Sequence, residues 1–218
     1  MAKADGYGHG AAPVAAEALK AGADYLAVAV LDEALSLRGA GFSGPLLVLG
    51  YTPPHQAALV AENGLTQTIY STEQAEALSA VASGLAVTVK VHLKVDTGMS
   101  RLGVTPGQAA DFAQSVDRLP NLLVEGIYTH FAKADSRDKS SARRQLAAFN
   151  EALSSVAGRG LAIPIKHCAN SAALIDLPEA HMDMVRAGIS LYGLWPSNET
   201  DQPVSLKPAM RLKTKIAM

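Results

Sequence analysis

Short apolar runs alternate with stretches in which apolar residues recur at helical spacing along almost the whole chain. The runs predict buried strands and the stretches predict helices that pack on them. Counting the residues before Lys3 as the first, the predicted strands are residues 1–2, 25–30, 46–50, 66–70, 86–96, 122–130, 163–168 and 182–186. The predicted helices are residues 11–21, 32–38, 53–63, 71–83, 106–116, 140–157 and 171–175.

Eight strands separated by helices predict a parallel sheet, because each crossover is long enough to make neighbouring strands parallel. The near-continuous apolar strands match a sheet covered on both faces. Their number and spacing favour an α/β fold of the (β/α)8 TIM-like barrel type over an open doubly wound sheet, which periodicity alone does not exclude. Asp32 is expected to cap the helix at 32–38, and Ser71 or Thr72 the helix at 71–83.

The longest predicted strand has one polar face and one apolar face. Its apolar residues should meet the covering helices, so its polar row should point into the barrel towards the mouth. That row consists of Lys90, His92, Lys94 and Asp96.

Composition narrows the class of protein. With 49% hydrophobic residues the 218-residue chain can build one sizeable core, and its net charge of −1 without a long basic run argues against nucleic acid as a partner. A single cysteine, Cys168, excludes an intrachain disulfide and fits a reducing cytoplasm. Neither a membrane-spanning apolar run nor a secretory signal is recognisable, so a cytoplasmic location is expected.

The first ten residues suit a cofactor that has both an aldehyde and a phosphate. Lys3 can form an imine with an aldehyde, while Tyr7 and the exposed amides of a turn with three glycines can hold an anion. A solvated lysine before an ordinary glycine-rich turn is the alternative. The rest of the chain adds polar residues at the carboxyl ends of the strands, where barrel enzymes place their sites. They are Lys94 to Arg101, His130, His167, Asn170, Ser171, Arg186, Gly188 and Ile189.

Five motifs in order resemble bacterial alanine racemase, a fold-type III enzyme that uses pyridoxal 5'-phosphate (PLP). They are residues 3–10 (KADGYGHG), 94–103 (KVDTGMSRLG), 129–131 (THF) with Asp135, 169–173 (ANSAA), and 185–189 (VRAGI) with 191–193 (LYG). The resemblance extends from residue 3 to residue 193. Two departures are Asp5, where asparagine is common, and Ala187, where proline is usual.

The resemblance assigns most of these residues to the cofactor. It implies that Lys3 binds PLP and acts as one of two catalytic bases, and that Arg186 faces the pyridine nitrogen. His167 would support Arg186, although a core histidine is the alternative. The phosphate would be held by Tyr7, by Ser171 and by the amides of Gly188 and Ile189. Asn170 and Tyr192 would belong to the same site. A plain helix cap is the alternative for Ser171.

The remaining roles concern the substrate. The resemblance implies that Arg101 contacts both the cofactor and the substrate carboxylate, and that the amide of Met99 meets that carboxylate. Lys94 matches a position that is carbamylated in some members, and a carbamate there could orient Arg101. His130 would tune the bases or be structural. No metal ion is expected.

The implied activity is interconversion of L- and D-alanine, with D-alanine destined for peptidoglycan. The family's second base is a tyrosine from the C-terminal β-domain of a homodimer partner, and nothing here matches it. We therefore expect residues 1–200 to form a barrel whose first strand and one helix are incomplete. Residues 201–218 should be the start of a connection to a missing domain, with a strand from about residue 207. A racemase of serine or another amino acid, or a PLP-binding domain without turnover, remains open.

Overall fold

The computed structural model describes residues 1–216. Its strands are β1 Leu26–Val28, β2 Leu46–Val48, β3 Thr66–Ile69, β4 Val89–Lys94, β5 Leu122–Tyr128 and β6 Ile165–His167. Its α-helices are α1 Lys3–Tyr7, α2 Ala11–Lys20, α3 Leu31–Gly39, α4 Ala57–Glu62, α5 Thr72–Gly84, α6 Ala109–Asp117, α7 Ser140–Gly158 and α8 Ser171–Asp176. The 3-10 turns are η1 Pro54–Gln56, η2 Pro106–Gln108, η3 Pro178–Ala180 and η4 Ile189–Tyr192.

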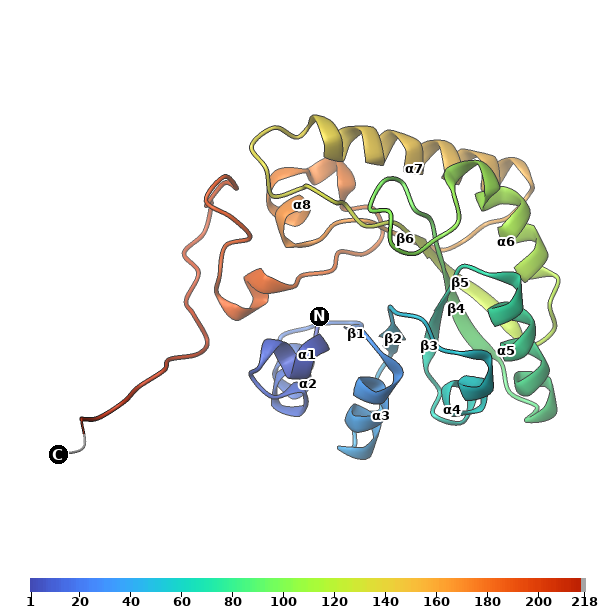
Figure 1. Ribbon diagram of the computed structural model, residues 1–218, viewed down its shortest axis with the longest axis horizontal. Helices are drawn as coiled ribbons and strands as arrows, with labels where there is room; N and C mark the ends of the chain where they lie inside the picture. The colour runs from blue at the N-terminus through green and yellow to red at the C-terminus, as the bar shows by residue number, and fades with distance from the viewer. Residues whose placement is uncertain (217–218) are drawn as a thin grey trace.

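The strands form one parallel sheet in which each strand pairs with the next along the chain, from β1 to β6. The sheet curls, and helices α3 to α7 follow one another along its outer side (Figure 1). This order of strands and helical crossovers confirms the barrel class of fold. Within residues 1–216 it has six assigned strands where eight were expected.

Residues 1–2 were expected to end the first strand, and this prediction is wrong in detail. The Ala2 N–H donates to Ala27 O beside β1 at 2.9 Å, and the Met1 amine donates to Ala187 O at 2.9 Å. These contacts place the segment between β1 and the last part of the barrel. Two residues are too few to form a ladder, so the segment lies in the strand's place without being a strand.

The segment at 182–186 was expected to be the last strand, and it is not one. It runs beside β6, where the Asp183 N–H donates to Lys166 O at 3.1 Å and the Arg186 N–H donates to Ala169 O at 2.9 Å. Met182 has a positive φ of 49°, which breaks the extended conformation at its start. The barrel therefore closes through isolated hydrogen bonds.

Most predicted helices are found within a few residues of their expected bounds. Ser71 caps α5, because its Oγ accepts the Gln74 N–H at 3.3 Å. The cap of α3 is Val30, not Asp32, and the carboxylate of Glu33 accepts the Val30 N–H at 3.3 Å. Glutamate three residues after the cap thus supplies one half of a capping box, the bond to the N–H of the cap residue itself.

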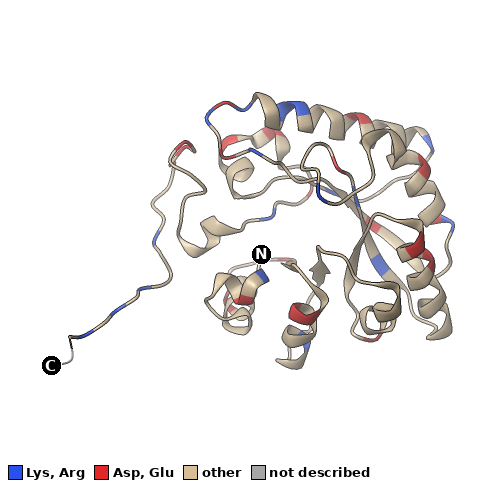
Figure 2. Ribbon diagram, viewed as in Figure 1, with Lys and Arg blue, Asp and Glu red and all other residues tan. Residues whose placement is uncertain are grey.

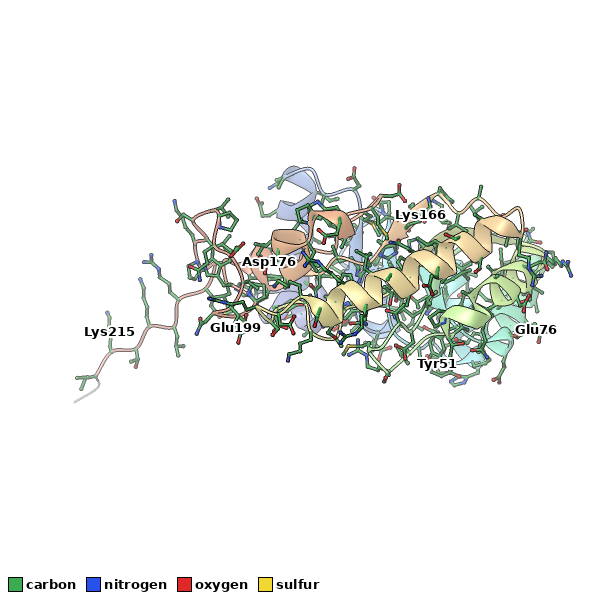
Figure 3. All side chains as sticks on the ribbon, turned by 90° about the horizontal axis from the view of Figure 1, so that it is seen from above. Tyr51, Glu76, Lys166, Asp176, Glu199 and Lys215 are labelled. Atoms are coloured by element: carbon green, nitrogen blue, oxygen red, sulfur yellow. The ribbon has the colours of Figure 1, made fainter. Side chains whose placement is uncertain are left out.

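The polar row of β4 points inward as predicted. His92 is fully buried and Lys94 is 6% exposed, and both contact residues of other strands across the interior. The apolar row, Val89, Val91, Leu93 and Val95, belongs to the main hydrophobic core, as do residues of α5, α6 and α7. Seen from above, α7 lies lengthwise across the molecule (Figure 3).

The last described residues extend away from the barrel (Figure 1). The strand expected from about residue 207 is absent over residues 207–216, and residues 217–218 lie outside the described part. Leu212 and Ile216 are almost fully exposed. Lysine and arginine are the charges along this tail, and Lys215 lies far from the barrel (Figures 2 and 3). No helix among residues 1–216 is long and apolar enough to cross a membrane.

Candidate active site

A cavity of about 460 Å³ opens at the carboxyl ends of the strands. Most of the residues predicted from the motifs line it. They are Lys3, Tyr7, Lys94, Met99, Arg101, His130, Asn170, Ser171, Arg186, Gly188 and Ile189. His167 and Tyr192 are also close, but each lies behind another site residue, His167 behind Arg186 and Tyr192 behind Tyr7.

Lys3 begins α1, a short turn that is left-handed. Ala4 and Asp5 have φ of 50°, and Tyr7 has φ of 54°. This conformation is unfavourable by about 1–2 kcal/mol for each residue that has a side chain. The expected strand end with a glycine turn is therefore replaced by a strained turn, which places the Lys3 Nζ 5.6 Å from the centre of the Tyr7 ring.

Two carboxylates hold this turn in place. Glu33 accepts the Ala4 N–H at 2.6 Å through one oxygen and the Ala29 N–H at 2.7 Å through the other, so it ties the turn to the end of β1. Asp5 accepts the Ala11 N–H at 2.7 Å at the start of α2. Since an asparagine oxygen could accept the same bond, the aspartate at position 5 is compatible with the same turn.

A small polar cradle lies beside the turn. Ser171 Oγ accepts the Gly188 N–H at 2.8 Å and the Ser190 N–H at 3.3 Å. A methyl group on Gly188 would lie 3.0 Å from the Tyr7 hydroxyl oxygen and 3.6 Å from Ser171 Oγ. The glycine therefore leaves a gap between the two hydroxyl groups, of a kind that suits a small anion.

Asn170 and Tyr192 support this cradle. Asn170 is the cap of α8, because its Oδ1 accepts the Ala173 N–H at 3.0 Å, so the interpretation of Ser171 as a plain cap is wrong. With the cap supplied by Asn170, the Ser171 hydroxyl is available to the cradle. The Tyr192 ring packs 4.8 Å from the Tyr7 ring.

Arg186 is a buried cation surrounded by neutral acceptors. It contacts His167 Nδ1 at 2.6 Å and His130 Nδ1 at 3.2 Å, and it donates to Thr129 O at 2.8 Å and Cys168 O at 3.2 Å. Burial, followed by the charge of Arg186, lowers the pKa of His130 to about 3 and that of His167 well below its ordinary range. Both rings are therefore neutral and can accept from the guanidinium.

Lys94 lines the same cavity as Arg186. Its Nζ donates to Val95 O at 2.9 Å and sits 5.3 Å from the centre of the Tyr128 ring. Burial, followed by the charge of Arg186, lowers the pKa of Lys94 to about 8, and Arg101 acts in the same direction. The amine is thus easier to deprotonate than an ordinary lysine.

The loop after β4 brings Met99 and Arg101 to the cavity. Asp96 Oδ1 accepts the N–H groups of Gly98 and Ser100, both at 3.0 Å, and so folds the loop back. Arg101 is exposed and Met99 is half-buried. An exposed arginine at the cavity rim can meet an anionic substrate without first losing a buried partner.

The alanine racemase N-terminal domain family matches residues 1–196. The chain belongs to this family. Among similar proteins, the alanine racemase of Desulfovibrio desulfuricans is 57% identical over 99% of this chain and 58% of its own length. That of Desulfosudis oleivorans is 50% identical, again over 99% of this chain and 58% of its own. The chain therefore spans less than two thirds of the length of these alanine racemases.

Solved structures of the family share the fold. Alanine racemase of Clostridium difficile 630, in complex with cycloserine, superposes with a TM-score of 0.92 at 39% identity, over 95% of this chain and 57% of that one. Alanine racemase of Bacillus anthracis with bound L-Ala-P gives 0.89 at 41% identity, over 95% and 54%. These matches bear out the barrel expected from the sequence.

Two residues that shape this cavity were missed in the sequence. The face of the Tyr128 ring meets Lys94 and Arg186, with its centre 5.1 Å from the Arg186 guanidinium carbon. It is two residues before His130, so strand alternation could have placed it on the same face. Glu33 gave no usable signal, because a glutamate in the first turn of a helix is common and its contact with the distant Ala4 N–H is set only by the fold.

Proposed function

We propose that the protein containing this domain interconverts L-alanine and D-alanine with PLP as its cofactor. The observation that carries the proposal is the convergence of Lys3, the Tyr7–Ser171–Gly188 cradle and Arg186 on one cavity. The names of the relatives support alanine as the substrate. A racemase of serine or another amino acid is not favoured by these names.

The residues of the cavity fit PLP. The gap above Gly188 lies between the hydroxyl groups of Tyr7 and Ser171 at the start of η4, which suits a phosphate. Lys3 supplies the one group in the strained turn that can bind an aldehyde covalently. Arg186 supplies donors only, so it suits an aromatic nitrogen that has no proton. When bound, PLP would withdraw electrons from the amino acid and make its Cα proton removable.

Lys3 and Arg186 would then have distinct tasks. The Lys3 amine would hold the cofactor and, once released from it, move the proton at Cα of alanine on one face. Arg186 stays cationic because guanidinium is protonated even when burial lowers its pKa. It would therefore keep the nitrogen that faces it unprotonated, which limits the electron withdrawal and with it the side reactions.

Arg101, Met99 and Lys94 would serve the substrate end of the cavity. Arg101 would pair with the alanine carboxylate, and the Met99 backbone would contact the same group. Lys94 as a bare ammonium would repel Arg101. A carbamate on Lys94 would reverse that charge and orient Arg101, so we include it in the proposed site.

Other parts of the activity belong to the whole protein. We infer a homodimer in which the partner subunit supplies the second base, because removing and returning the proton on opposite faces needs a group opposite Lys3. A cytoplasmic location and delivery of D-alanine to peptidoglycan complete the proposed function.

Trapping on Lys3 tests the cofactor assignment. PLP is added to the protein and to the variants Lys3→Met and Lys20→Met, followed by borohydride reduction and peptide mapping. We expect the label on Lys3 in the unmodified protein and in K20M, which loses an exposed lysine that pairs with Glu17, and the loss of the label in K3M. A label distributed over surface lysines would contradict the assignment.

Exchange at Cα tests the reaction itself. The longer protein that contains this domain, incubated with L-alanine in deuterated water, should produce D-alanine and incorporate deuterium at Cα. PLP bound on Lys3 without any exchange would instead support a binding domain without turnover.

A further inference from the structure

A path of side-chain contacts continues from Arg186 into the barrel interior. Arg186 Nη1 lies 2.6 Å from His167 Nδ1, His167 Nε2 lies 2.8 Å from His92 Nδ1, and His92 Nε2 lies 3.4 Å from Glu125 Oε2. Both histidines are fully buried, and the Glu125 side chain is 13% exposed. We call Arg186, His167, His92 and Glu125 the interior path.

The chemistry of the two ends gives the path a direction. A guanidinium only donates, so His167 Nδ1 must accept. In a neutral ring the other nitrogen then has the proton, so His167 Nε2–H donates to His92 Nδ1. His92 Nε2–H in turn points to Glu125, which only accepts when ionised. Arg186 and Glu125 therefore require the same tautomer, with the proton on Nε2, in both rings.

The surrounding residues hold the path in place. The Tyr128 ring stacks on the His167 ring with centroids 4.6 Å apart and planes 10° apart. At the far end, Tyr25 donates its hydroxyl to Glu125 at 2.9 Å and Lys90 pairs with it at 2.5 Å. The carboxylate thus has three donors around it, so its position is fixed independently of Arg186.

The backbone is also shaped around the path. Between β4 and β5, Val91 pairs with Val124 but His92 pairs with Gly126, so Glu125 is an extra residue in a bulge. Bulges commonly redirect a side chain next to a functional site. A methyl group on Gly126 would lie 2.5 Å from two atoms of the His92 ring, so only glycine leaves room for the ring here.

The charges lie at the two ends only. The His92 hydrogen bond is the largest cause that lowers the pKa of Glu125, to about 2, and Lys90 and Tyr25 add to it. Burial is the largest cause that lowers the pKa of His92 and His167. The interior path thus connects a buried cation to a carboxylate through two neutral rings, and it fixes orientation without moving a proton.

We propose that Glu125 is a positioning residue for Arg186 and acts through His92 and His167. Its carboxylate polarises the two rings and strengthens His167 Nδ1 as an acceptor, as carboxylates do behind metal-binding histidines. The guanidinium is then held in one orientation and presents its remaining donors to the cavity. The effect on the cofactor rests on the proposed function, whereas the direction of the path does not.

The direction is tested first, without cofactor. The protein is labelled with ¹⁵N-histidine, and the tautomer of each ring is read from its two nitrogen shifts. We expect His92 and His167 both to be neutral with the proton on Nε2. A proton on Nδ1 of either ring, or a charged ring, would overturn the proposal whether or not any variant folds.

The role of the carboxylate is tested with Glu125→Gln, which keeps the shape and removes the charge. The matched control is Asp176→Asn, which removes another buried carboxylate, one that pairs with Lys139 and accepts the Asp201 N–H. We expect the side-chain ¹⁵N resonances of Arg186 to shift in E125Q. In Glu125→Asp, which keeps the carboxylate, they should lie closer to those of the unmodified protein. In D176N they should be unchanged. Unchanged Arg186 resonances in folded E125Q would overturn the proposal.

The consequence for turnover is measured in the PLP-loaded longer protein that contains this domain. There E125Q should lower kcat about 10-fold while KM for alanine changes less than about twofold, because the carboxylate acts through Arg186 and not on the substrate. Equal kcat in E125Q and the unmodified protein would contradict the effect on the cofactor. If PLP fails to label Lys3 while both rings have Nε2–H, the proposed function fails and the interior path stands.

Discussion

Burial determines the protonation of the individual side chains around the cavity. It is the largest cause of the lowered pKa of Lys94, His130, His167 and Arg186. Desolvation disfavours the charged form of each group. The two imidazoles are consequently neutral at neutral pH, whereas the guanidinium keeps its charge. Arg186 is thus a permanent buried cation among neutral acceptors, and the pKa of Lys94 beside it is lowered to about 8, close to physiological pH.

That lysine should react with carbon dioxide. Only the neutral amine of Lys94 attacks CO₂, forming the N–C bond of a carbamate and releasing a proton. Since its pKa is about 8, we expect the modified fraction to rise as pH rises through 8 at constant dissolved CO₂. A ¹³C carbamate signal from labelled CO₂ measures it. The signal should vanish in Lys94→Ala and persist in Lys20→Ala, and a protein without any signal would contradict the prediction.

Glu125 should contribute to the pH dependence of stability. Its pKa in the folded protein is about 2 against an ordinary value of 4.5, so its contribution is fully present above pH 4.5 and is lost as pH falls towards 2. E125Q lacks this contribution. We therefore expect the difference in urea midpoint between the two proteins to shrink as pH is lowered from 5 to 3. A difference that stays constant over this interval would mean that Glu125 does not titrate as described.

At the scale of single elements, periodicity predicted the ordinary helices well and could not predict α1. Helices such as α5 and α7 agree with expectation because their apolar residues repeat at helical spacing and face the sheet. The left-handed turn of α1 has no such signature, because alanine and aspartate rarely adopt positive φ. Local hydrogen bonds, the Glu33 carboxylate that accepts the Ala4 N–H and the Asp5 carboxylate that accepts the Ala11 N–H stabilise it together. Glu33 is distant in sequence, and the Asp5 contact depends on side-chain geometry.

Replacing Ala4 by glycine should release part of this strain. Glycine adopts positive φ readily, so we expect A4G to raise the free energy of unfolding by about 1 kcal/mol. The control is Ala16→Gly in the exposed interior of α2, which should lower it by about 1 kcal/mol. Urea denaturation measures both. Two changes of the same sign would show that the turn is not strained.

The bulge in β5 gives a second prediction at this scale. Gly126→Ala places a methyl group against the His92 ring, and overpacking of this kind destabilises a core by about 1–3 kcal/mol. Gly158→Ala at the end of α7 is the control, since a methyl group there meets nothing within 4 Å and should be neutral or slightly stabilising. Urea denaturation gives the free energy of unfolding of both variants. If G126A were as stable as the unmodified protein, the tight fit between Gly126 and the His92 ring would be contradicted.

At the scale of the whole molecule, the sequence predicted the class of fold and most of the residues that meet at the cavity. The motifs placed Lys3, Arg101, Ser171 and Arg186 at the carboxyl ends of the first, fifth, seventh and eighth predicted strands, and the barrel brings them together. What the sequence could not predict was how the barrel closes. The segment at 182–186, with three apolar residues among five, resembles a short strand in sequence, whereas its actual conformation depends on the positive φ at Met182 and on what lies beside it.

This closure should be the part of the barrel that opens first. The ladder between β4 and β5 has six residue pairs, among them Leu93 with Ile127, and one bulge at Glu125. The amides of Ala2 and Asp183, in contrast, each make one hydrogen bond to a neighbouring segment, beside a second cavity of about 510 Å³. Local opening there disrupts few contacts, so it requires less free energy than opening the ladder. Amide hydrogen exchange should therefore be faster at Ala2 and Asp183 than at Leu93 and Ile127. Equal protection at all four amides would instead mean that the barrel opens as one cooperative unit.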